Sequence, residues 1–183
     1  MAAAEIEGTV RDQIAALAEV AESLGVELVH CKPHGALYHA ANKSAEVAAA
    51  IGRAVLESSE QLIMVGQAGS STLALWESMG LTCAAEAFAD RAYEPDGSLV
   101  SRRKPGAVLH DPQEVAARML RLAQQGVVTA VDGSTVRIEA ESVCVHGDSP
   151  GAVEMARQVR LRLEGAGVAI RPFVDPAGAS QGA

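Results

Sequence analysis

Apolar residues recur every three to four positions between residues 10 and 24, which is the spacing of one face of an α-helix. A glycine follows this stretch and gives the helix a place to end. Further along the chain, Ser44, Ser70 or Ser71, and Asp111 each precede a stretch with helical spacing and are candidate N-caps. The sequence therefore predicts helices over residues 10–24, 45–57, 71–79, 112–125 and 150–164.

Short and nearly continuous apolar runs lie between these helices, as is typical of buried strands in a parallel sheet. The predicted strands are residues 27–31, 61–65, 82–88, 142–145 and 168–172. A hairpin is also expected over residues 127–138, because its Asp132-Gly133 pair favours a type I′ turn. Strands and helices alternate four times, which predicts an α/β fold with a parallel sheet flanked by helices. We expect one domain over residues 1–174 and a flexible tail over 175–183.

The composition is that of a globular protein. The chain has 183 residues, of which 49% are hydrophobic, and its formal net charge is −8. A negative field disfavours nucleic acid and anionic membrane surfaces as partners, and no apolar stretch has the length needed to cross a bilayer. The three cysteines include no CxxC pair, so we expect buried, reduced thiols and a cytoplasmic protein.

Polar side chains follow three of the predicted strands at the point where each strand ends. In chain order they are Lys32, His34, Asp90, Arg91, Tyr93, His146 and Asp148. The carboxyl ends of parallel strands meet at one edge of a sheet, where α/β proteins place their working residues. We therefore expect His34, Asp90 and His146 to converge on one rim.

Several of these residues also have a structural interpretation. His34 would bond a loop carbonyl, Asp148 would cap the following helix, and Asp90 with Arg91 would close a loop as an ion pair. The connection over residues 89–111 is long, and loops of this length are usually functional. It carries the basic run Arg102-Arg103-Lys104, which is either a solvated loop or a clamp for phosphate or carboxylate.

Four ordered motifs carry a resemblance to a known family. They are KPHGALY at residues 32–38, FADRAYEPDG at 88–97, KPGAV at 104–108 and CVHGD at 144–148. Together they resemble the LamB/YcsF family of 5-oxoprolinase A subunits over most of the chain. The sequence has no Walker A or GxSxG motif, so ATP binding through a P-loop in this chain is not expected.

The resemblance implies a fold, an activity and partners. The fold is part of an irregular (β/α) barrel similar to polysaccharide deacetylases. The activity is the hydrolysis of 5-oxo-L-proline, a cyclic amide, to L-glutamate, with ATP as co-substrate and with partner subunits B and C. The candidate catalytic residues are His34, Asp90, His146 and Asp148. The candidate substrate- or phosphate-binding residues are Lys32, Arg91, Tyr93, Arg102 and Arg103.

One departure from the family pattern leaves other functions open. The acidic and His-containing motifs that begin family members do not occur here, so we expect a truncated or split protein that is inactive alone. A metal-dependent amidohydrolase or deacetylase is an alternative, with a divalent metal on His34 and His146. A non-catalytic binding or regulatory subunit is another. An unclosed sheet also predicts a homodimer that covers the open edge.

Overall fold

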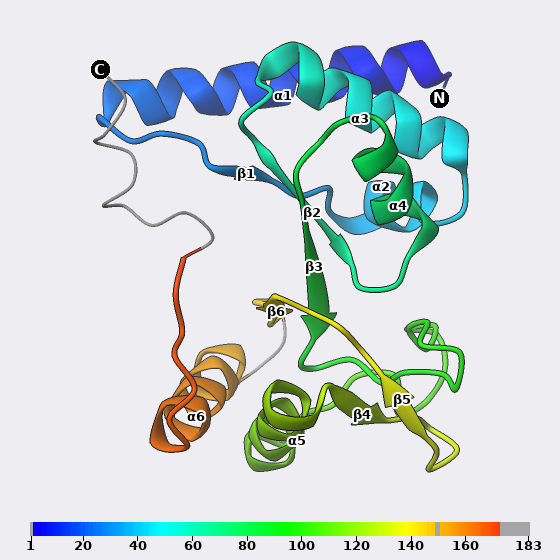
Figure 1. Ribbon diagram of the computed structural model, residues 1–183, viewed down its shortest axis with the longest axis vertical. Helices are drawn as coiled ribbons and strands as arrows, with labels where there is room; N and C mark the ends of the chain where they lie inside the picture. Colours follow the sequence, from blue (N-terminus) through cyan, green and yellow to red (C-terminus); the bar gives the residue numbers. More distant parts are fainter. Residues whose placement is uncertain (1, 149–150, 173–183) are drawn as a thin grey trace. The chain divides into compact units, whose positions relative to one another are not determined.

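The computed structural model describes residues 2–148 and 151–172, and it divides the chain into two compact units, Met1–Ala85 and Glu86–Ala183 (Figure 1). The elements up to the boundary are α1 (Ala3–Ser23), β1 (His30–Cys31), α2 (Gly35–Ala41), α3 (Ala45–Ser58), β2 (Ile63–Gln67), α4 (Ser71–Ser78) and β3 (Cys83–Phe88), whose end lies in the second unit. The remaining elements are α5 (Pro112–Gln125), β4 (Val127–Thr129), β5 (Thr135–Arg137), β6 (Ser142–Cys144) and α6 (Ala152–Gly165).

Four strands form a sheet in the order β1-β2-β3-β6. β1 runs parallel to β2, and β3 runs parallel to β6, with Phe88 opposite Cys144. This confirms the predicted fold class, a parallel sheet flanked by helices. A fifth strand over Val168–Pro172 is wrong, because these residues form neither strand nor helix.

The helix starts follow the predicted caps. The Ser44 hydroxyl accepts from the backbone N–H of Val47, and the Ser70 hydroxyl accepts from that of Leu73. Asp111 accepts from two backbone N–H groups in the first turn of α5. The sequence analysis missed α2 because Pro33 and Gly35, which begins α2 with a φ of 57°, have the composition of a turn.

The first unit has its core between α3, α4 and β2. Trp76 on α4 is buried, and its indole N–H donates to the Ala48 carbonyl of α3 at 2.8 Å. Gly66 on β2 lets the helix approach, since a Cβ there would lie 3.0 Å from the indole ring. α1 lies along α3, and the pair between Arg53 and Glu7 ties the two helices together at 2.8 Å.

The second unit contains a parallel strand pair, an antiparallel hairpin and two packed helices. The buried side chains of α5 are Val115, Ala116, Met119 and Leu122, and those of α6 are Met155, Val159 and Leu163. The β4–β5 hairpin is confirmed, but its type I′ turn is wrong. Gly133 has a φ of 86°, whereas Asp132 lacks the positive φ that this turn requires. The Gly133 N–H instead donates to the Ala130 carbonyl, and the Asp132 side chain accepts from the backbone N–H of Ser134.

The three cysteines are free thiols, each half-buried rather than buried. Burial raises the pKa of Cys31, and burial together with the charge of Glu77 raises the pKa of Cys83 to about 11. Among the described helices, none combines the length and the apolar character that crossing a membrane requires. The predicted tail over 175–183 lies outside the described residues, and the single domain over 1–174 stays a prediction.

The buried indole generates a stability prediction. Trp76→Phe removes a buried ring and the hydrogen bond to Ala48, so we expect the free energy of unfolding to fall by about 2–3 kcal/mol. Urea unfolding measures it. The control Thr9→Ala removes an exposed hydroxyl from α1 and should change stability by less than about 0.5 kcal/mol. A loss of that small size in Trp76→Phe would contradict the prediction.

Candidate active site

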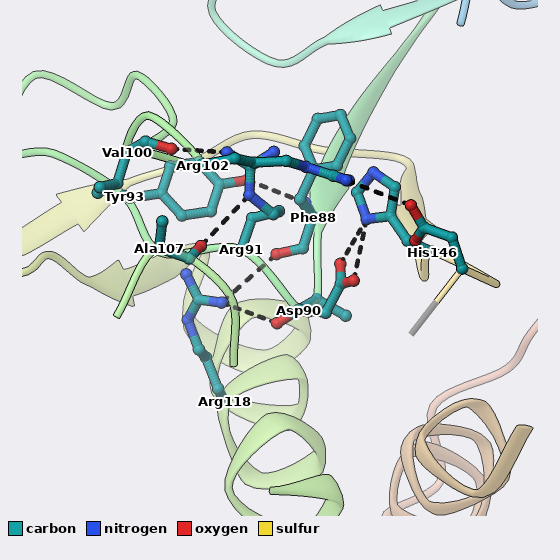
Figure 2. Close-up of polar contacts among 11 residues, drawn as sticks. Phe88, Asp90, Arg91, Tyr93, Val100, Arg102, Ala107, Arg118 and His146 are labelled. Carbon is teal, nitrogen blue, oxygen red and sulfur yellow. Dashed lines mark hydrogen bonds and ion pairs between the residues drawn. The ribbon is translucent and has the colours of Figure 1, made fainter. Parts of the chain in front are cut away.

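An aspartate and a histidine meet beyond the ends of two neighbouring parallel strands. Phe88 pairs with Cys144 at the ends of β3 and β6, and Asp90 and His146 each follow two residues later. The shared register therefore brings the two side chains together. His146 Nδ1 lies 2.8 Å from one carboxylate oxygen of Asp90 and 2.9 Å from the other (Figure 2).

The two partners differ in their contact with solvent. The Asp90 side chain is 3% exposed, whereas the His146 side chain is 23% exposed. A carboxylate accepts hydrogen bonds only, so Nδ1 carries the proton in this contact and Nε2 is the nitrogen that can exchange a proton. The Phe88 ring stacks on the imidazole at 5.6 Å between centroids and fixes its plane. This arrangement suits a general base or acid.

The long loop over residues 89–111 is held from within by Arg91 and Tyr93. Arg91 Nη2 donates to the Val100 carbonyl at 2.6 Å, and its Nε donates to the Ala107 carbonyl at 3.3 Å. The Tyr93 hydroxyl accepts from the backbone N–H of Phe88 at 2.9 Å. Burial lowers the pKa of Arg91 and raises that of Tyr93. Both side chains are almost fully buried, and their predicted binding of substrate stays a prediction.

An exposed ion pair lies at the solvent side of the site. Arg102 Nη1 is 3.3 Å from Asp148 Oδ2, and both side chains are exposed. Hydrogen bonding from Arg102 holds the pKa of Asp148 below its usual range, and the charge of His146 acts in the same direction. The expectation that Asp148 caps α6 is wrong, because Gly151 holds the N-cap position and no side chain caps the helix there.

The remaining predicted residues are less constrained. Arg103 is exposed, and its backbone N–H donates to the Ser101 hydroxyl. His34 is exposed at the N-cap position of α2, and Lys32 lies over the Tyr38 ring at 6.0 Å. Lys32 and His34 belong to the first unit, so their convergence with Asp90 and His146 stays a prediction.

Arg118 on α5 is a contact residue that the sequence analysis missed. Its Nη1 donates to the Ala89 carbonyl at 2.9 Å and approaches the Phe88 carbonyl at 3.4 Å (Figure 2). Helical spacing could have found it, because position 118 lies three residues after Val115 and four before Leu122, on the buried face of α5.

The described residues do not supply a metal centre. Asp90 and His146 provide two potential ligands, but residues 2–148 and 151–172 contain no cluster of three His, Cys, Asp or Glu side chains that could hold a metal ion. A catalytic zinc usually takes three protein ligands. We therefore derive no chemical step through a metal.

Sheet, helices and strand-end site together define an α/β protein of the kind found as part of a (β/α) barrel. The solved structure of a lactam utilization protein from Thermus thermophilus matches it with a TM-score of 0.90 and 40% identity, over 94% of this chain and 69% of that one. The family model described as LamB/YcsF family matches residues 1–178. The chain belongs to the LamB/YcsF family.

Curated relatives agree with this assignment. A protein of Pseudomonas syringae pv. tomato, named as the third 5-oxoprolinase A subunit of that organism, is 52% identical over 173 residues, covering 94% of this chain and 68% of the relative. The 5-oxoprolinase A subunit of Photorhabdus laumondii is 52% identical over 162 residues, covering 88% of this chain and 64% of the relative. The chain thus spans about two thirds of the length of the relatives it matches.

The phenol contact beside the site generates a second stability prediction. Tyr93→Phe leaves the buried N–H of Phe88 without its acceptor, so we expect a loss of about 1–3 kcal/mol in the free energy of unfolding. Urea unfolding of both proteins tests this. Thr135→Val serves as control, because it removes a hydroxyl on the exposed β5 and should have an effect below about 0.5 kcal/mol. Equal losses in the two variants would contradict the prediction.

Proposed function

We propose that this chain is part of the A subunit of an ATP-dependent 5-oxoprolinase and that Asp90 and His146 carry out proton transfer in it. The names of the relatives support the reaction class, since they are 5-oxoprolinase A subunits and a lactam utilization protein. The single observation that supports the site is the contact between His146 Nδ1 and the buried carboxylate of Asp90.

The chemistry explains why such a pair is needed. A lactam amide is a poor electrophile, and transfer of the ATP γ-phosphoryl group to its carbonyl oxygen makes the carbonyl carbon reactive. His146 Nε2 then removes a proton from water as the water oxygen adds to that carbon. The same nitrogen returns the proton to the ring nitrogen as the C–N bond breaks, which yields glutamate, ADP and phosphate. Asp90 stabilises the intermediate imidazolium and keeps the ring oriented.

Anion recognition is assigned to the exposed side of the site. 5-Oxoproline carries a carboxylate, and its activated form carries a phosphate. Arg102 can bind either group through its planar guanidinium once it leaves Asp148. Asp148 then also becomes available as a second proton carrier. Arg103, Lys32 and His34 are further candidates for the same anionic substrate or for proton transfer.

The partners follow from the reaction. The sequence has no P-loop motif, so we assign ATP binding to the assembled complex with subunits B and C and not to a Walker-type site in this chain. The half-buried free thiols fit a reducing compartment, and we assign the reaction to the cytoplasm. A chain that binds partners without contributing to turnover is the main rival.

Removal of the proton carrier tests the proposal. We expect His146→Gln and Asp90→Asn to lower kcat by about 10²–10⁴-fold, because Asp90→Asn favours the wrong imidazole tautomer and His146→Gln removes the base. Glutamate formation from 5-oxoproline and ATP by the assembled complex is the measurement. His110→Gln alters an exposed histidine and should retain the parent rate. A complex with His146→Gln that turns over at the parent rate would support the rival, a non-catalytic subunit.

The anion site generates a separate prediction. Arg102→Ala removes a charged hydrogen-bond donor for the substrate, so we expect the KM for 5-oxoproline to rise about tenfold, with a smaller change in kcat. The matched control is Arg137→Ala, which breaks an exposed ion pair on β5 and should leave the KM unchanged. An unchanged KM in Arg102→Ala would remove this residue from the binding site.

A further inference from the structure

We infer that Arg118 is a positioning residue, which holds the backbone segment that presents both Phe88 and Asp90 to His146. The inference rests on the proposed role of the Asp90–His146 pair. Arg118 lies on α5 and does not itself contact the imidazole. It acts on the strand end through the two peptide carbonyls that precede Asp90.

The contacts on this segment are complete on both sides of the backbone. The Phe88 N–H donates to the Tyr93 hydroxyl, and the Ala89 N–H donates to the Cys144 carbonyl at 2.9 Å. The carbonyls of the same two residues accept from Arg118 Nη1. β3 ends at Phe88, so these carbonyls lie where the sheet ladder stops, and a charged donor makes a stronger hydrogen bond than a neutral one.

The same segment carries both side chains that fix the imidazole. Phe88 stacks on one face of the His146 ring, and Asp90 holds its Nδ1. A displacement of the segment therefore moves both contacts at once. The guanidinium of Arg118 lies 5.1 Å above the Tyr93 ring, so Arg118 and Tyr93 brace the segment together (Figure 2).

Electrostatics favour the same role. Burial lowers the pKa of Arg118, while the charges of Tyr93, Glu114 and Asp90 oppose this shift. A guanidinium withdrawn from water close to a buried carboxylate offsets part of the desolvation of that carboxylate. Arg118 Nη2 is buried and makes no hydrogen bond to any described group, which costs about 1–3 kcal/mol. A residue kept only for stability would not be expected to carry this penalty.

The imidazole tautomer provides the test, because it does not depend on turnover. The ¹⁵N resonances of the His146 ring are recorded for the whole chain and assigned by their loss in His146→Gln. In the parent protein we expect the neutral ring to carry its proton on Nδ1. Arg118→Gln removes the charge and the fork of donors, so the tautomer with Nε2 protonated should become comparable in population. Arg118→Lys keeps the charge, and its spectrum should lie between those of the parent and Arg118→Gln.

Arg121→Gln is the matched control, because Arg121 also lies on α5 but donates to exposed hydroxyls of the β4–β5 hairpin. Its spectrum should match that of the parent. In the assembled complex, Arg118→Gln should lower kcat about 10- to 100-fold while KM stays within about twofold.

The inference is overturned if the folded Arg118→Gln protein keeps the parent tautomer, or if Arg121→Gln changes it equally. If Arg118→Gln does not fold, Arg118→Lys decides in the same way: a parent-like spectrum overturns the inference and a shifted one supports it. Failure of the proposed function is a separate result, because it would leave turnover intact in His146→Gln whatever the tautomer in the Arg118 variants.

Discussion

Burial of one carboxylate is the constraint on which the second unit depends. Asp90 is almost completely enclosed, and an ionised carboxylate in such a place costs several kcal/mol unless charges and hydrogen bonds compensate it. His146 supplies a direct hydrogen bond, and the positive charge of Arg118 acts from α5. The ends of β3 and β6 and the packing of α5 are thus tied to a single ionised group, and the imidazole orientation follows from the same contacts.

Strand register converts this local requirement into a site. A parallel pair places residues at equal distances beyond its last rung side by side, so a slip of one residue between β3 and β6 would separate Asp90 from His146. The loop over 89–111 must then leave β3 without disturbing Asp90. Arg91 achieves this by binding two carbonyls of the loop, and Tyr93 by binding back to Phe88. These contacts keep a long loop ordered beside the site.

Most helices and the parallel sheet could be predicted from sequence, because Ser44, Ser70 and Asp111 give local capping signals and the strands are short apolar runs. The failures share a cause. α2 was missed, Asp148 pairs with Arg102 instead of capping α6, and Val168–Pro172 forms no strand, since each outcome depends on tertiary contacts. The Asp90–His146 contact followed from strand-end placement. Arg118 did not, because a helical arginine reads as solvated unless its face is known to be buried.

Burial also explains why two aspartates near one histidine have different roles. Asp148 and Arg102 form an exposed pair, and such pairs contribute only about 0–1 kcal/mol because water screens them. Exchange of Asp148 for a substrate anion on Arg102 is therefore inexpensive. Asp90 cannot exchange its partner so easily, since breaking its contact leaves an enclosed carboxylate without its hydrogen bond. The site thus combines a fixed proton-transfer pair with a replaceable anion contact, which is what a reaction needs when the substrate must enter and leave while the base stays oriented.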